Sequence, residues 1–206
     1  HSTARRQAGE APLGRVFLLA VTCCLLLASC CAGRLPTTVK IGLSAPFEGS
    51  DRDLGYEVLH AVRLAVRQRN EAGGAGGYLV ELVALNDFNE APEAVVQARK
   101  MAVDPGVLGV VGGWTPEVAA AASAEYERLG LAFLAPGVPF AAGSPPDPAG
   151  AAFAEGYEAL SGGAPPGPAA VWAYEATRRL LDAIEAAGRG RQPPGREAVS
   201  AALAGP

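Results

Sequence analysis

Few residues of this chain are of the types that perform covalent catalysis, and their positions limit what they can do. All four cysteines, Cys23, Cys24, Cys30 and Cys31, lie near the N-terminus, and His60 is the only histidine after residue 1. A Cys–His pair therefore has no cysteine in the main part of the chain, and Ser–His catalysis would have to use His60. Zinc sites need paired ligands from separate positions of a fold, which this distribution does not offer. We expect no enzyme, no cofactor and no metal site.

The cysteines lie within and just after an apolar leader. Arg5, Arg6 and Arg15 are basic, and the apolar stretch that follows spans residues 16–28. That stretch is too short for a comfortable membrane span, which needs about 20 apolar residues. A basic start, a short apolar core and small residues at its end are typical of a secretory signal. Residues 1–29 are therefore predicted to be a signal peptide.

The end of the leader carries a more specific signal. Leu27-Ala28-Ser29-Cys30 resembles the bacterial lipobox, in which a signal peptidase cuts before a lipid-modified cysteine. This predicts that Cys30 is lipidated, that residues 30–38 form a tether, and that the chain is anchored outside the cytoplasm. A plain signal peptide or an uncleaved anchor helix is the alternative. Cys31 is then a spare thiol or a second acylation point.

The composition allows one ordinary domain and argues against nucleic-acid partners. The chain has 206 residues, 50% of them hydrophobic, with 18% charged residues and a net charge of −4. No cluster of Lys and Arg supplies the basic face that nucleic-acid binding requires.

Beyond the tether, β-rich runs alternate with helical patterns. The expected strands are 39–43, 78–85, 107–111 and 131–134, and the expected helices between them are 54–72, 92–103 and 116–129. Such alternation predicts a three-layer α/β fold with a parallel sheet and helices on both faces. Ligands of these sheets bind at the carboxyl ends of the strands. His60 falls away from the apolar stripe of the first helix, so it is expected to face solvent.

After Pro136 the alternation stops. Residues 137–150 are rich in Pro, Gly and Ala, and helices are expected at 151–160, 169–187 and 197–203. No strand is expected after Leu134.

Several motifs occur in the order known from one family. They are VKIGLSAPFEG, RNEAGG, VELVALND, PEAVVQARKMAVDPGVLGVVGG and YERLGLAFLAP, which together run from Val39 to Pro136, and the later AEGYEAL and AVWAYEATRRLLDAIEAAG. They resemble the type I periplasmic binding proteins, and most closely the branched-chain amino-acid (Leu/Ile/Val-type) substrate-binding proteins of ABC transporters.

The resemblance implies a Rossmann-like or flavodoxin-like lobe at residues 39–138, with a C-terminal helical segment, 139–206, packing on it. It implies a small amino-acid or amide solute, ABC permease subunits as partners, and a membrane contact through the lipid anchor. Family members close two lobes on the solute, whereas most of the segment for the second lobe is missing here. We therefore expect weak solute binding or none.

Four ligand-site residues are carried over from the family onto this sequence. Trp114 and Thr115 occupy the loop that contacts the α-carboxylate and α-ammonium of the solute, and Phe47 supplies an apolar wall. Gly137 stands in the loop where the family usually has a threonine. Thr115 also suits a helix N-cap, and Trp114 also suits a cover for the end of the sheet. The residues Asn86-Asp87 suit either a polar rim or the turn that ends a strand.

Two other function classes remain open. A degenerate single-lobe sensor or protein-interaction module at the membrane surface would expose an apolar patch or self-associate. A flavodoxin-like receiver or small enzyme is disfavoured because the first strand ends in Ser44-Ala45 rather than in an acidic pair.

Overall fold

The computed structural model describes residues 37–136, 150–188 and 192–205. The predicted signal peptide, Cys30 and Gly137 lie outside these residues. The elements in chain order are β1 (Thr38–Ala45), α2 (Arg52–Glu71), β2 (Leu79–Asn86), α3 (Ala91–Val103), β3 (Val107–Val111), α4 (Pro116–Arg128), β4 (Ala132–Leu134), α6 (Gly150–Ser161), α7 (Pro168–Ala187) and α8 (Arg196–Ala204).

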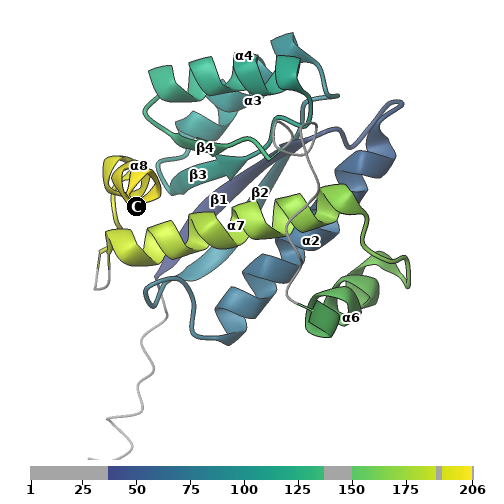
Figure 1. The fold of residues 1–206 in the computed structure, drawn as a ribbon. Helices are drawn as coiled ribbons and strands as arrows, with labels where there is room; N and C mark the ends of the chain where they lie inside the picture. Colours follow the sequence, from purple (N-terminus) through teal and green to yellow (C-terminus); the bar gives the residue numbers. More distant parts are fainter. Residues whose placement is uncertain (1–36, 137–149, 189–191, 206) are drawn as a thin grey trace, which may run out of the picture. The chain divides into compact units, whose positions relative to one another are not determined.

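The four strands form one parallel sheet in the order β2-β1-β3-β4. Ala45 pairs with Asn86, Leu43 pairs with Val111, and Val111 pairs with Leu134. The carboxyl ends of all four strands therefore meet at one edge of the sheet (Figure 1). The expected parallel α/β fold is confirmed.

Helices cover both faces of the sheet and make three layers. α2 and α7 lie on one face, and α3 and α4 lie on the other (Figure 1). α2, which connects β1 to β2, lies on one face of the sheet. α3 and α4, which follow β2 and β3, lie on the other face, so the chain crosses between faces after β2. The direction of winding thus reverses between β1 and β3, which are neighbours in the sheet.

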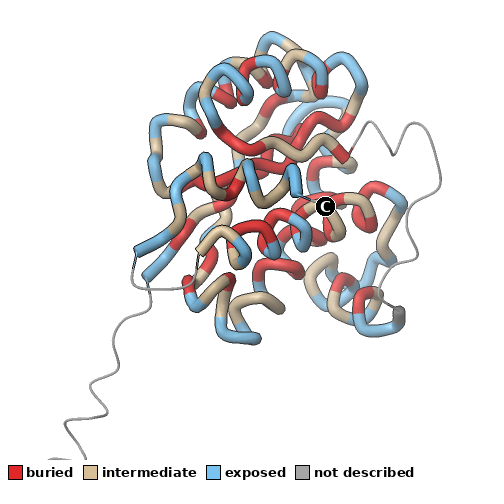
Figure 2. Tube along the Cα trace, turned by 60° about the vertical axis from the view of Figure 1, so that its left-hand side comes forward, coloured by how far each residue is buried: buried red, intermediate tan, exposed pale blue. Residues whose placement is uncertain are grey.

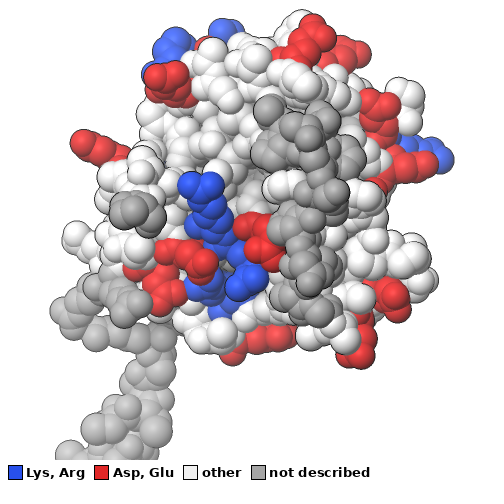
Figure 3. Space-filling view, viewed as in Figure 1, with Lys and Arg blue, Asp and Glu red and all other residues white. Residues whose placement is uncertain are grey.

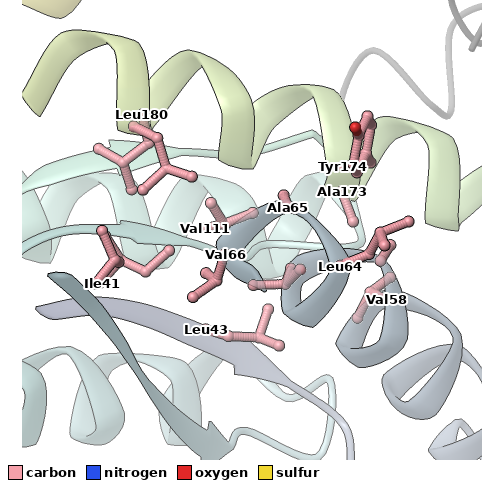
Figure 4. Packing of buried hydrophobic residues seen from close by; sticks show 14 of the residues in the cluster. Ile41, Leu43, Val58, Leu64, Ala65, Val66, Val111, Ala173, Tyr174 and Leu180 are labelled. Carbon is pink, nitrogen blue, oxygen red and sulfur yellow. The ribbon is translucent and has the colours of Figure 1, made fainter. Parts of the chain in front are cut away.

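The larger hydrophobic core lies between the sheet and the α2–α7 layer. Ile41 and Leu43 point from the sheet toward Val58, Leu64 and the apolar side of α7 (Figure 4). A smaller core on the other face contains Met101, Val110 and Tyr126, and the Tyr126 ring stacks on Phe133 at 4.6 Å. The buried positions follow the sheet and the helix sides that face it (Figure 2).

Two details differ from the sequence-based expectations. β1 continues through Ser44 and Ala45, because these residues still pair with Leu85 and Asn86. The expectation that His60 faces solvent is wrong. Its ring is half-buried and packs edge-on against Tyr157 of α6 at 6.0 Å.

The last helix is joined to the amino end of the sheet. The guanidinium of Arg196 donates to the carbonyl oxygens of Ala102, Asp104 and Val107 at 3.1, 2.6 and 2.9 Å. These carbonyls belong to the end of α3 and the turn into β3. No helix in the described part of the chain is both long and apolar enough to cross a membrane.

Candidate functional site

The candidate site is the edge where the four strands end. Its centre is the junction between β1 and β3, where the winding direction reverses. In open α/β sheets, the loops on either side of such a junction diverge and leave a crevice for a ligand. The loops here are 46–51 after β1 and 112–115 after β3.

Close backbone approaches shape both loops. A side chain at Gly55 of α2 would place its Cβ 1.8 Å from the carbonyl oxygen of Pro46, so only glycine lets the first loop lie on the helix. Gly113 has φ +74°, and a Cβ there would lie 2.8 Å from Ala119 Cα. Glycine at these two positions therefore fixes how the loops leave the sheet.

A chain of buried hydrogen bonds connects the ends of three strands. The indole N–H of Trp114 donates to the Ser44 carbonyl oxygen at 2.9 Å, and the Ser44 hydroxyl donates to Asp87 Oδ2 at 2.7 Å. Trp114 is only 4% exposed, and Asp87 is fully buried. Burial raises the pKa of Asp87, while the hydrogen bonds from Ser44 and from the Asn89 amide act in the opposite direction.

The loop after β2 is held in an uncommon backbone conformation. Phe88 and Asn89 have φ of 54° and 60°, the left-handed region that side chains other than glycine rarely adopt. Asn86 Oδ1 accepts from the Phe88 amide at 3.1 Å, and Asp87 Oδ1 accepts from the Asn89 amide at 2.9 Å. These side-chain acceptors stabilise the strained turn, which leaves the Phe88 ring 41% exposed.

The same loop is tied to the loop after β1. Asn86 Oδ1 also accepts from the Phe47 amide at 2.9 Å, and Asn89 Nδ2 donates to Asp51 Oδ2 at 2.8 Å. Because one oxygen accepts from both Phe47 and Phe88, the two backbones are close neighbours at this edge. The loops after β1, β2 and β3 are thus fixed to one another before any ligand arrives.

The residues expected to bind ligand come together at this edge as far as they are described. Phe47 is half-buried, and its ring lies edge-on to Tyr56 at 6.2 Å. Thr115 caps α4, and its hydroxyl oxygen accepts from the Val118 amide at 3.4 Å. Trp114 covers the junction of β1 and β3, with its N–H directed into the protein. Pro136, the last described residue after β4, precedes Gly137.

Sequence reasoning placed Ser44, Phe88 and Asn89 in the segments at the strand ends but gave none of them a role. The one signal for Ser44 is a hydroxyl at the end of an otherwise apolar strand. Nothing in the sequence indicates a left-handed conformation at Phe88, because phenylalanine disfavours it. The side chains of Asn86 and Asp87 accept hydrogen bonds within the turn that ends β2, as expected if they form that turn rather than a polar rim.

The described residues contain no candidate metal centre, and the buried acid of the edge is engaged in the fold. No group of three or more His, Cys, Asp or Glu side chains that could hold a metal occurs within residues 37–136, 150–188 and 192–205. The one buried carboxylate at the edge, that of Asp87, is already occupied by Ser44 and Asn89.

Comparison with known proteins decides the family. The sequence profile of the periplasmic binding proteins matches residues 38–138, which contain β1 to β4 and the whole described edge. Residues 38–138 of this chain belong to the periplasmic binding protein family. The family consists of solute-binding proteins rather than enzymes.

Curated relatives of this periplasmic binding protein cover the same region. Leu/Ile/Val-binding protein homolog 2 of Brucella abortus is 29% identical over 114 residues, which are 55% of this chain and 30% of the relative. The amino acid binding protein of Pseudomonas aeruginosa is 28% identical over 99 residues, 48% of this chain and 26% of the relative. The matches thus span less than a third of the relatives' length.

Solved structures show that the fold is that of type I periplasmic binding proteins. A branched-chain amino acid ABC transporter protein from Rhodospirillum rubrum aligns with a TM-score of 0.68 at 18% identity, over 81% of this chain and 89% of that one. A substrate-binding protein from Streptococcus pneumoniae, solved with isoleucine, aligns with a TM-score of 0.67 at 15% identity, over 82% of this chain and 88% of that one. At these identities the likeness concerns the fold.

Proposed function

We propose that the chain is a solute-binding protein of an ABC importer and that it binds a small amino-acid-like solute of the branched-chain type. The observation that carries the proposal is the location of the preorganised edge within the residues that match the family. The relatives named as Leu/Ile/Val-binding and amino acid binding proteins supply the solute class.

The proposed contacts follow from the geometry of the edge. The first turn of α4 begins at Thr115, and the positive end of that helix favours the carboxylate of the solute. Phe47 offers a half-buried ring for an apolar side chain. Trp114 forms the floor between β1 and β3. The family resemblance adds Gly137, which lies outside the described residues, as a further proposed contact.

The proposed affinity is weak, because this lobe supplies only one side of a closed site. A solute held at about 1 µM by two lobes has a binding free energy of about −8 kcal/mol, and half of that corresponds to about 1 mM. Isothermal titration of the full chain with leucine, isoleucine, valine and small amides tests this. A millimolar dissociation constant supports binding by a single lobe, and a micromolar or tighter dissociation constant contradicts it.

The matched variants for that titration are Thr115→Val and Thr115→Ser. Serine keeps the hydroxyl that caps α4, whereas valine removes it and leaves the shape. We expect leucine binding to persist in Thr115→Ser and to fall several-fold in Thr115→Val. If no solute binds and the chain self-associates in sedimentation experiments, the single-lobe interaction module becomes the better assignment.

The proposed location is outside the cytoplasm, with residues 1–29 removed as a signal peptide and Cys30 carrying the lipid. Residues 30–38 then form the tether, 39–138 the lobe and 139–206 the helical segment, with permease subunits as the partners. Mass measurement of the native N-terminal peptide tests the anchor. A diacylglyceryl-modified Cys30 supports it, and an unmodified cysteine after residue 29 or an intact leader contradicts it.

A further inference from the structure

A cavity with a volume of about 340 Å³ is lined by residues of α2, of α6 and of the segment that leads into α7. Figure 1 shows α2 lying beside both α6 and α7. The lining residues of the cavity include Asp53, Tyr56, Glu57 and His60 of α2 and Tyr157 of α6. This volume is at the lower end of the range for small-ligand sites.

One carboxylate of the cavity is held in a fixed position. Glu57 Oε1 accepts from the Ala170 amide in the first turn of α7 at 2.9 Å. A Cβ at Gly167 would lie 2.5 Å from the same oxygen, so glycine makes room for it. Glu57 Oε2 has no described partner, which leaves part of the negative charge available within the cavity.

Aromatic rings form other walls of the same cavity. The Tyr157 ring lies perpendicular to the His60 ring, at 90° and 6.0 Å. The Tyr157 hydroxyl donates to the Glu57 carbonyl oxygen at 3.2 Å, which fixes the ring. Burial, and secondly the charge of Glu57, raise the pKa of Tyr157 to about 12, so its ring stays neutral. Tyr56 is 49% exposed and lies at the open side.

No Lys or Arg side chain lines this cavity. Three other cavities along α7 each include Arg69, Arg178 or Arg179, and basic side chains gather on the face of the molecule that shows α7 (Figure 3). Burial, and secondly Arg63, lower the pKa of His60, which favours the uncharged ring. Asp53 forms an exposed ion pair with Arg52, whose Nε lies 3.6 Å from Asp53 Oδ1.

We propose that the cavity between α2, α6 and α7 binds a small organic cation, such as a quaternary ammonium or methylated amine group. The Glu57 carboxylate, with Asp53 at the rim, supplies the charge complementarity, and the rings of Tyr56 and His60 supply the cation–π contacts that such groups favour. A carboxylate-bearing solute is repelled by the Glu57 charge. The cavity adjoins the proposed amino-acid site but does not coincide with it, since Tyr56 lines the cavity and lies edge-on to Phe47.

The test compares choline with its neutral isostere 3,3-dimethylbutan-1-ol on the full chain, followed by NMR of the His60 and Tyr157 ring signals. We expect choline to shift these signals in a saturable way and the neutral alcohol to leave them unchanged. Equal shifts with both compounds, or no saturable shift with choline, overturn the proposal.

Substitutions inside and outside the cavity test where choline binds. Glu57→Gln keeps an acceptor for the Ala170 amide but removes the charge, and Tyr56→Ala removes an exposed ring. We expect each to weaken choline binding by roughly three- to tenfold. Glu127→Gln, an exposed position on α4, makes the same charge change on the opposite face of the sheet and should change binding less than twofold.

Thr115→Val, which affects the proposed amino-acid site, should leave choline binding unchanged. The two proposals can therefore be told apart, because choline binding can be absent while leucine binding persists, and leucine binding can be absent while choline binding persists. If Glu57→Gln and Glu127→Gln weaken choline binding equally, the attraction is a property of net charge and the proposal is overturned.

Discussion

The two edges of the sheet are built from different kinds of contact. At the amino edge, Lys40 pairs with Asp104 at 2.7 Å, and Arg196 gives three hydrogen bonds to backbone carbonyls. At the carboxyl edge, buried side chains hold loops of unusual backbone shape, and aromatic rings stay exposed. The amino edge joins the C-terminal helix to the fold, while the carboxyl edge presents a defined surface.

The backbone angles show the same contrast. Some turns at the amino edge lead from a helix into a strand. The described residues with positive φ in these turns are glycines, such as Gly73, Gly74 and Gly130. Within the described ranges, the non-glycine residues with positive φ are Phe88 and Asn89, both at the carboxyl edge. Strain that a glycine would relieve is retained at the proposed solute site, which is typical of functional sites.

The largest expected effect is on the amino edge. Arg196→Ala removes three charge-assisted hydrogen bonds and should lower the free energy of unfolding by about 3 kcal/mol. Arg179→Ala is the control, because Arg179 gives one exposed bond to the Leu203 carbonyl. Chemical denaturation measures both. Equal losses in the two variants would show that Arg196 is not the main contact of α8 with the sheet.

The next effect concerns the buried carboxylate of the carboxyl edge. Because burial raises the pKa of Asp87 above its ordinary 3.8, the folded state holds this proton more tightly than the unfolded state. The contribution of Asp87 to stability therefore falls as pH rises from about 4 through its raised pKa in the folded state. Asp87→Asn should flatten this part of the stability profile, as measured by denaturation from pH 4 to pH 7.

Glu125 gives the opposite pH dependence and serves as the reference. Hydrogen bonds from Arg128 and Arg99 lower its pKa from 4.5 to about 2, so its contribution is lost as pH falls between these values. Glu125→Gln should flatten the acid side of the profile only. An unchanged slope above pH 4 in Asp87→Asn would contradict the role assigned to burial.

A smaller effect separates the two tryptophans. Trp114→Phe removes the hydrogen bond to Ser44, whereas Trp172→Phe removes an indole N–H that is buried without a partner among the described residues. Unfolding free energies should show Trp114→Phe to be less stable than Trp172→Phe by about 1 kcal/mol. Equal stabilities would mean that the bond between β1 and the loop after β3 contributes little.

The smallest expected effect measures the strain at Phe88. Glycine adopts the left-handed conformation freely but is more flexible when unfolded, so the two contributions partly cancel. Phe88→Gly should be more stable than Phe88→Ala by about 0.5 kcal/mol in thermal unfolding. A less stable glycine variant would show that the turn is not strained.

The sequence predicted the order of elements because periodicity is local. The run 107–111 is apolar throughout and flanked by Gly106 and Gly112, and it forms β3 at those residues. Prolines and glycines helped to place the helix ends within two residues of the observed ones. β1 was predicted to end at Leu43, whereas pairing with β2 keeps Ser44 and Ala45 in the strand.

The candidate site was only partly predictable, since its contacts join distant parts of the chain. Ser44 and Asp87 are 43 residues apart, and Trp114 and Ser44 are 70 apart. His60 was assigned to solvent from its own helix, and α6, a hundred residues later, half-buries it. Family resemblance pointed to Phe47, Trp114 and Thr115, which the structure places at the carboxyl edge, but it gave no information on which polar groups fix the loops there.

The most direct test of the account is an amide NMR titration of the full chain with L-leucine. We predict saturable amide chemical-shift changes confined to residues 45–49, 86–90 and 112–117, with a dissociation constant of the order of 1 mM. Shifts centred on the amino edge, at residues 72–78, 104–106 or 195–197, would contradict the assignment of the carboxyl edge as the solute site, as would the absence of any saturable shift.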